Sequence, residues 1–94
     1  MTTTTVYCRR CEASFELPAL PDSDRARIVE VVRSRQTTEG IRLLRQASGI
    51  ELRDAKAVEM HITRKPGVCQ RCRGQLQSSG QTECPKCGSL NLDW

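Results

Sequence analysis

The chain has few aromatic residues: one tyrosine, one phenylalanine and one tryptophan among 94 residues. Aromatic side chains bury the largest apolar areas, so Tyr7, Phe15 and Trp94 cannot build a core by themselves. A chain of this length also buries only a modest share of its surface. We therefore expect its stability to come from well-packed helices and from crosslinks such as bound metal ions.

Long apolar runs are absent as well. No stretch approaches the roughly 20 apolar residues that span a bilayer. The segment from Met1 to Thr5 lacks the basic start and the apolar run of a secretory signal. We expect a cytoplasmic protein with no membrane partner. In that compartment thiols stay reduced, so paired cysteines are more often metal ligands than disulfides.

A strong excess of one charge is also missing. Fifteen basic residues, twelve of them arginine, are interleaved with eleven acids, and the formal net charge is +4. A zinc ion held by four thiolates carries a net charge of about −2, so metal binding lowers the total. The charge is therefore compatible with an acidic partner but does not require one.

Cysteine is the residue that the chain has in quantity. All six cysteines fall in Cys-x-x-Cys pairs. Two intervening residues form a tight turn that directs both sulfurs at one ion, and zinc prefers four ligands in a tetrahedron. Eleven residues separate the second pair from the third, enough for a short two-stranded hairpin. The spacing predicts one metal site formed by Cys69, Cys72, Cys84 and Cys87.

The last pair lies in the run Cys84-Pro85-Lys86-Cys87-Gly88, where proline stiffens the turn and glycine can adopt positive φ. Residues 68–94 resemble the zinc-ribbon and rubredoxin-type knuckle families, in which this Cys-Pro-x-Cys-Gly pattern recurs. The resemblance implies a structural zinc ion, with iron as a minor alternative because four thiolates also accept it. The competing hypothesis is a set of redox-active dithiols or disulfides, although the chain lacks a thioredoxin-like strand–helix context.

Cys8 and Cys11 form a third pair, with a tyrosine before it and a phenylalanine after it. One such knuckle supplies only two ligands, so the rest of a metal shell must come from elsewhere. One source is the pair Cys69 and Cys72. That combination would place the helices inside the ribbon and leave Cys84 and Cys87 outside the metal site. The others are His61, although a lone helical histidine is usually a surface residue, and a second protomer. Without a metal role, the two would be free or oxidisable thiols.

We expect a small α+β fold in which zinc knuckles, built as short β-hairpins, flank a three-helix segment. Residues 1–21 form the N-terminal knuckle, with short strands from Val6 to Leu17 that Pro18 and Pro21 close. Residues 22–66 form the helical segment. Residues 67–94 form the C-terminal ribbon.

Apolar residues recur at helical spacing between residues 22 and 63. A short side-chain oxygen can accept the free N–H groups at a helix start. Asp22 or Ser23 can therefore cap a first helix, and a threonine at position 37 or 38 can cap a second. Gly49 lies where a left-handed C-terminal residue belongs, and a third helix begins near residue 52. The predicted inward positions are Ile28, Val31, Val32, Ile41, Leu44, Ala47, Leu52, Ala55, Val58 and Ile62.

The second and third of these helices carry a further pattern. Residues 40–56 read Gly-Ile-Arg-Leu-Leu-Arg-Gln-Ala-Ser-Gly-Ile-Glu-Leu-Arg-Asp-Ala-Lys. They resemble the helix-turn-helix of the bacterial ribosomal stalk protein's C-terminal domain, with the Ser48-Gly49-Ile50 turn and the Ala55-Lys56 pair in register. Those helices contact translational GTPases. The resemblance implies that a protein partner contacts Ile41, Arg42, Arg45 and Lys56.

The chain departs from the stalk pattern in two respects. Glu51 replaces a glycine, and the strands that surround the helices in the stalk domain have no convincing equivalents here. Two interpretations therefore stay open. The helices keep a binding face, or they are reused as a packing module in which Ile41 belongs to the core. The departures favour the packing module.

Catalysis is not expected. A closed shell of four thiolates leaves no position for a reactive water, and the chain has no phosphate-binding glycine loop or nucleophile motif. The main hypothesis is a non-enzymatic zinc module that binds a protein partner linked to translation or the ribosome. The alternatives are a nucleic-acid-binding ribbon, with phosphate contacts from Arg9, Arg10, Arg71 and Arg73, and a thiol-based redox protein.

Overall fold

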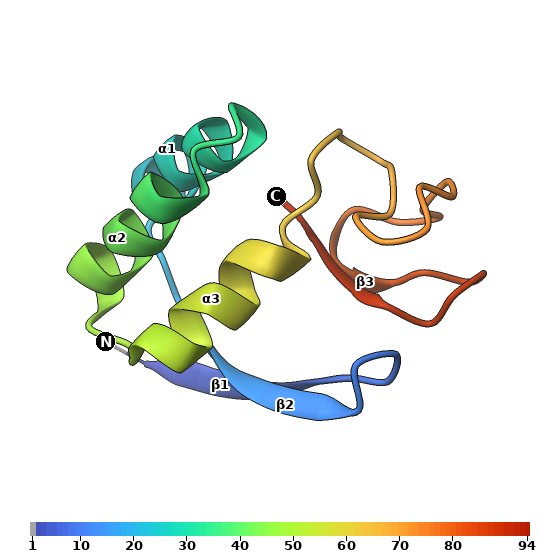
Figure 1. The fold of residues 1–94 in the computed structure, drawn as a ribbon, viewed down its shortest axis with the longest axis horizontal. Helices are drawn as coiled ribbons and strands as arrows, with labels where there is room; N and C mark the ends of the chain where they lie inside the picture. The colour runs from blue at the N-terminus through green and yellow to red at the C-terminus, as the bar shows by residue number, and fades with distance from the viewer. Residues whose placement is uncertain (1) are drawn as a thin grey trace.

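The computed structural model describes residues 2–94 and shows a small α+β fold (Figure 1). Three helices lie along the chain between two antiparallel hairpins, as the sequence predicted at this coarse level. The elements are β1 (Thr3–Cys8), β2 (Ala13–Pro18), α1 (Asp22–Arg33), α2 (Thr37–Ser48), α3 (Leu52–His61), β3 (Gly80–Glu83) and β4 (Leu90–Asp93).

The N-terminal hairpin carries the first cysteine pair at its tip. Strands β1 and β2 pair with Val6 opposite Phe15 and Cys8 opposite Ala13. Alternate side chains of β1 point into the core, so Val6 and Cys8 are buried. Strand β1 begins at Thr3, earlier than predicted, and β2 includes Pro18, one residue beyond the predicted end at Leu17. Pro18 lies opposite Thr3 in the hairpin.

The helices begin at the predicted places but without the predicted caps. Asp22 is already the first residue of α1 and follows Pro21, and Gln36 precedes α2. Neither start has a side-chain hydrogen bond to the free N–H groups. Asp22 instead lies in the first turn, where a negative charge interacts favourably with the helix dipole. Gly49 ends α2 with a φ of 73°, which confirms the predicted left-handed position.

Most predicted inward positions are buried, with one clear exception. Leu44, Val58 and Ile62 have no exposed surface, whereas 44% of Leu52 is exposed. Leu52 is the first residue of α3, so its side chain lies at the end of the helix rather than along its packed face. Ile41 and Ala47 are half-buried and pack against the edge of the core.

Helices α1 and α2 lie side by side, and α3 lies between them and the N-terminal hairpin (Figure 1). Gly40 marks a close approach of the first two helices. A Cβ atom there would come within 2.7 Å of Val32 Cγ2. Only a glycine fits this contact without a shift of the neighbouring side chain.

The C-terminal hairpin differs from the predicted one. Strands β3 and β4 lie on either side of the Cys84–Cys87 knuckle, with Glu83 opposite Leu90. The expected hairpin between the second and third cysteine pairs is therefore wrong. Residues 73–83 contain only one strand, β3, and Gln75 forms a single bridge to Val68, which precedes the second cysteine pair. Much of the stretch is turn-forming serine and glycine.

Two apolar clusters result. The larger draws side chains from both hairpins and all three helices, including Leu90 and Leu92 of β4. The smaller contains only Cys69, Leu76 and Cys84 as buried members. Backbone pairing joins the two parts, because Ile62 bridges Leu92 after α3 ends. Within the described chain, no helix has the length and apolar character needed to cross a membrane.

Candidate metal centres

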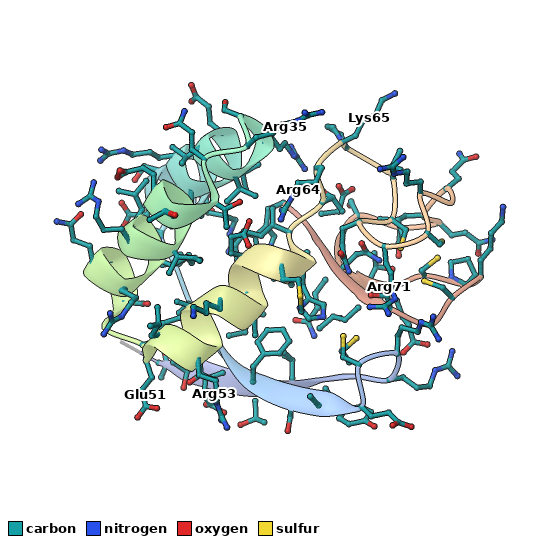
Figure 2. All side chains as sticks on the ribbon, in the orientation of Figure 1. Arg35, Glu51, Arg53, Arg64, Lys65 and Arg71 are labelled. Carbon is teal, nitrogen blue, oxygen red and sulfur yellow. The ribbon has the colours of Figure 1, made fainter. Side chains whose placement is uncertain are left out.

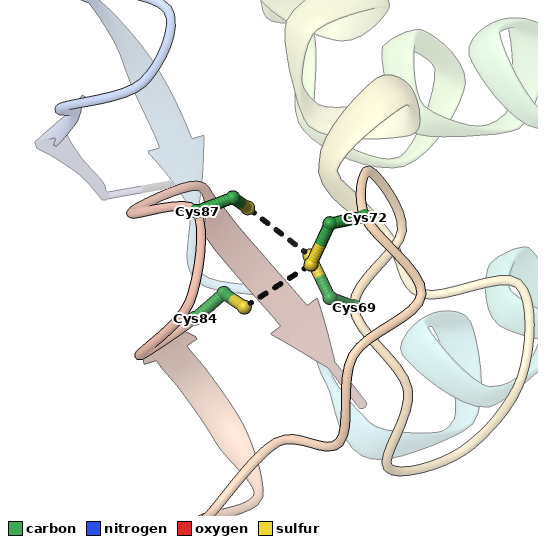
Figure 3. Close-up of side chains that lie close together, drawn as sticks. All are labelled: Cys69, Cys72, Cys84 and Cys87. Atoms are coloured by element: carbon green, nitrogen blue, oxygen red, sulfur yellow. Dashed lines mark hydrogen bonds between the residues drawn. The ribbon is translucent and has the colours of Figure 1, made fainter.

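Four cysteines from two knuckles meet in the C-terminal part. The sulfurs of Cys69, Cys72, Cys84 and Cys87 all lie within 4.8 Å of one another (Figure 3). Cys69 Sγ lies 3.7 Å from Cys87 Sγ, and Cys72 Sγ lies 3.5 Å from Cys84 Sγ. All four are free thiols. The structure therefore brings together the two knuckles that the sequence predicted to share one metal site.

These distances fit a metal ion at the centre. Zinc–sulfur bonds of about 2.3 Å in a tetrahedron place neighbouring sulfurs about 3.8 Å apart. The two observed separations, 3.7 and 3.5 Å, lie close to that edge. Four thiolates also suit iron. The group can therefore hold a metal ion, and its chemistry does not by itself select the element.

Backbone geometry prepares Cys69 to bind as a thiolate. Burial would raise the pKa of the Cys69 thiol, but N–H groups of Cys72 and Arg71 and the Asn91 amide donate to its sulfur. Together they lower that pKa to about 6. Arg71 N lies 3.4 Å from Cys69 Sγ. This sulfur is consequently ionised at neutral pH, as a metal ligand must be.

The two thiols of the second knuckle have pKa values shifted in opposite directions. The N–H group of Cys87 donates to the Cys84 sulfur and lowers the pKa of that thiol. Burial and the neighbouring sulfurs raise the pKa of Cys87 to about 12. Without metal, four thiolates this close cannot all be charged. A divalent cation removes that repulsion, which is a physical reason for a cation at this position.

Asn91 supports this site and was missed from the sequence. Its amide nitrogen lies 3.4 Å from Cys69 Sγ, and its carbonyl oxygen accepts the N–H of Gln70 at 2.8 Å. It has no exposed surface, although it is polar. The sequence does contain a signal for it, since Asn91 lies between two leucines just after the last knuckle. Successive side chains of a strand point to opposite faces, so Asn91 points away from the core that Leu90 and Leu92 share.

A second group forms around the N-terminal knuckle. One ligand atom each from Cys8, Cys11 and His61 lies within 4.8 Å of the others. Cys11 Sγ and His61 Nε2 are 3.7 Å apart. The sequence left three possible sources for the further ligands of this knuckle. Among them, the structure places His61 beside Cys8 and Cys11. Cys69 and Cys72 belong to the other group. His61 is 2% exposed, so it is not the surface residue that a lone helical histidine usually is.

The residues expected to contact a partner lie outside both groups. Arg42, Arg45 and Lys56 are exposed, whereas Ile41 is half-buried. Arg42 is paired with Glu39 one turn earlier in α2. Arg45 Nε lies 3.4 Å from the carbonyl oxygen of Ile50, at the turn between α2 and α3. Arg45 and Lys56 form no ion pair with any residue between 2 and 94.

Other basic residues line a groove between α1 and the first C-terminal knuckle. Figure 2 shows Arg35, Arg64 and Lys65 at the same end of the molecule. The groove has a volume of about 620 Å³, and Arg73 belongs to its lining. Arg9, a residue predicted to contact phosphate, instead lies 3.2 Å from a carboxylate oxygen of Glu83.

Comparisons with protein families, curated proteins and solved structures found no match to this chain.

Proposed function

We propose that this is a non-enzymatic zinc protein in which a structural ion at the four-cysteine site supports an interaction surface. The convergence of four sulfurs within 4.8 Å of one another carries the proposal. A shell of four thiolates leaves no coordination position for a substrate or a reactive water. The ion therefore stabilises the fold rather than performing chemistry.

The C-terminal part needs such a crosslink. Its own buried cluster contains one leucine, Leu76, and two of the cysteine ligands. Leu90 and Leu92 of β4 pack in the larger cluster, so the small cluster alone must order the two knuckles before β4. A cluster of this size cannot offset the loss of chain entropy in such a segment. Metal binding supplies that free energy in small knuckle domains.

Metal analysis tests this proposal. Purified protein should retain zinc at the four-cysteine site, and removal by a strong chelator should unfold residues 67–94. Amide hydrogen exchange would show this as loss of protection in β3 and β4. A metal-free protein that keeps native protection in these strands would overturn the structural role. An iron centre would instead give strong visible absorption, which zinc lacks.

Alkylation separates zinc binding from the redox alternative. Thiolates in a closed zinc shell should react slowly with iodoacetamide, and chelation should make them react fast. Rapid alkylation of the metal-loaded protein would support the thiol-based redox function. Cys72 is the exposed member of the group, so it is the most sensitive reporter.

For the partner, we propose a protein linked to translation that contacts α2 and α3 through Ile41, Arg42, Arg45 and Lys56. The exposure of the three basic residues supports this, and the stalk-like pattern suggests a translational GTPase. Charge reversal at Arg45 and Lys56 should weaken binding to a purified elongation factor at least tenfold. Arg27→Glu, an exposed change on α1, is the matched control. Equal binding by all variants would favour the packing-module interpretation.

The basic groove favours a second candidate function, binding of the phosphate backbone of RNA. Arg33, Arg35, Arg64, Lys65 and Arg73 line it, and no acidic residue of the described chain belongs to its lining. Arg33 and Arg64 are engaged by Asp93 and Glu59. Arg35, Lys65 and Arg73 form no ion pair with any residue between 2 and 94 and so stay available for phosphate.

Fluorescence anisotropy with a labelled single-stranded RNA tests this function. Affinity should fall steeply with added salt, because phosphate binding releases counterions. Lys65→Glu should weaken binding, and Arg27→Glu should weaken it much less. Binding that salt leaves unchanged, or that Lys65→Glu does not affect, would exclude the groove as a phosphate-binding surface.

A further inference from the structure

The three Cys-x-x-Cys turns share one backbone conformation. The residue after each second cysteine has positive φ: 55° at Glu12, 64° at Arg73 and 78° at Gly88. Two of these are not glycine, and side chains rarely adopt this conformation. A backbone N–H also donates to the first sulfur in two of the turns, from Cys11 to Cys8 Sγ and from Arg71 to Cys69 Sγ, each at 3.4 Å. The N-terminal turn therefore shares these local features with the turns of the four-cysteine site.

The sulfur of Cys8 is held like a metal ligand. It accepts N–H groups from Cys11 and Leu90, each at 3.4 Å. Leu90 belongs to β4, so the C-terminal hairpin supplies a donor to the N-terminal knuckle. A completely buried sulfur with two N–H donors is stabilised as a thiolate rather than as an apolar thiol.

His61 presents the correct nitrogen to this knuckle. Its Nδ1 lies 2.7 Å from the carbonyl oxygen of Ala57, one turn earlier in α3. A carbonyl can only accept, so Nδ1 carries the proton. In the neutral ring the lone pair is then on Nε2, which lies 3.7 Å from Cys11 Sγ. Phe15 stacks on the ring with centroids 4.9 Å apart and fixes its plane. This support of a metal-binding imidazole by a backbone carbonyl is common at metal sites.

The described chain offers three ligands here and not four. Between residues 2 and 94, no fourth cysteine, histidine or carboxylate joins the group. Ser89 Oγ is 3.9 Å from Cys8 Sγ, but it accepts the amide N–H of Gln70 at 2.9 Å and donates to the carbonyl of Leu90. Its hydroxyl is therefore engaged in the four-cysteine half of the molecule.

A small pocket adjoins the group formed by Cys8, Cys11 and His61, on the side where a fourth ligand would bind. Its volume is about 190 Å³, and Cys11 and His61 are part of its wall. The rest of the wall is mainly apolar, including Ala13, Phe15 and Met60, with Arg53 as its one cation. Cys11 is half-buried, whereas Cys8 has no exposed surface. A small donor molecule can therefore reach an ion only from the side of Cys11 and His61.

We propose that Cys8, Cys11 and His61 form a second zinc site with three protein ligands, whose fourth position takes an exogenous thiolate. Two thiolates and a neutral imidazole leave a zinc complex with no net charge, so an anionic donor is accepted. The apolar wall suits the carbon atoms of a small thiol, and Arg53 adds a positive charge to that wall.

Charge and protons balance without a redox step. Binding of Zn²⁺ releases to solvent any protons still carried by the thiols of Cys8 and Cys11. An incoming thiol would release its proton to solvent and take the fourth position in place of a water molecule. No electron would be transferred, and on release the thiolate would take a proton from solvent again while water took its place.

Cobalt-loaded protein tests this site. Wild-type protein should bind two Co²⁺ per chain, and Cys11→Ser should bind one, with the four-cysteine ion retained. Addition of 2-mercaptoethanol, with a phosphine reductant present throughout, should change the thiolate-to-cobalt absorption of the wild type only. Native mass spectrometry should then show a one-thiol adduct on the two-metal chain and none on Cys11→Ser.

Three results would overturn the proposal. The first is a folded wild-type protein with one metal, located at the four cysteines. The second is a two-metal protein whose spectrum does not respond to the thiol. The third is a doubled mass on metal loading, which would show that a second copy supplies the fourth ligand. Each leaves the structural role of the four-cysteine ion standing, because that role is tested by chelation and hydrogen exchange.

Discussion

Asn91 shows how one buried polar side chain can prepare a metal ligand. Its amide donates to Cys69 Sγ, and its carbonyl holds the backbone of Gln70 within the same knuckle. Both contacts orient the knuckle before an ion arrives. A side chain in this position affects metal affinity without touching the metal.

Asn91→Ala should therefore lower zinc affinity about 10- to 100-fold. The change removes the donor to Cys69 and leaves the N–H of Gln70 without its acceptor. Competition against a chromophoric zinc chelator would measure it. Gln81→Ala, an exposed change in β3, is the control. An unchanged affinity in folded Asn91→Ala protein would show that the amide has no part in metal binding.

The ionisation of the thiols predicts how metal retention depends on pH. In the folded chain the pKa of Cys69 is lowered from 9.0 to about 6, and that of Cys8 is also lowered to about 6. Both are thiolates at pH 7 and take up protons as the pH falls through 6. Zinc affinity should fall progressively as the pH is lowered through 6, because protons then compete for these two ligands. Free-zinc indicator titrations would show this.

At the scale of elements, the contact between α1 and α2 depends on a missing side chain. Gly40 lies where a Cβ would meet Val32 Cγ2 at 2.7 Å. Helix propensity alone would favour alanine at this position by about 1 kcal/mol. The packing constraint opposes that preference, because Val32 is buried and has little room to move.

Gly40→Ala should lower the free energy of unfolding by about 1 to 3 kcal/mol, the usual cost of overpacking. Urea denaturation would measure it, with Gln46→Ala on the exposed side of α2 as the control. In a Val32→Ala background the cost should become smaller, since the clashing methyl group is gone. A stabilising effect of Gly40→Ala would show that the helices can move apart without cost.

At the scale of the whole molecule, Arg33 joins three segments far apart in sequence. From α1 it donates to the carbonyl and the hydroxyl of Thr63, at 3.0 and 2.7 Å. It also lies 3.5 Å from a carboxylate oxygen of Asp93 in β4. That carboxylate accepts the hydroxyl of Thr63 and the N–H of Gly67. The helices and the C-terminal hairpin thus meet at one charged network.

Arg33→Ala should destabilise the protein by about 3 kcal/mol, because it leaves the largely buried carboxylate of Asp93 without its cation. Thermal or urea denaturation would measure this, with Arg27→Ala as the control from the same helix. Arg33→Lys should rescue it only in part, since lysine lacks the planar group that reaches both oxygens of Thr63. No effect of Arg33→Ala would show that water replaces the guanidinium.

Local features of this protein follow from its amino-acid sequence alone. Spacing between cysteines predicted the group at Cys69, Cys72, Cys84 and Cys87, because two-residue turns and short loops restrict where sulfurs can go. Apolar periodicity predicted three helices and most of their buried positions. These are properties of neighbouring residues. They were less dependable at the ends of elements, where Leu52 is exposed and the expected caps lie inside the first turns.

The residues that surround the N-terminal cysteines depend instead on tertiary packing. Cys11 and His61 are separated by fifty residues, and no periodicity links a hairpin tip to the end of a distant helix. Their proximity follows from the packing of α3 on β2. The pairing of β3 with β4 and the placing of Asn91 were decided in the same way. Each depends on which surfaces are buried together, and that is a property of the whole chain.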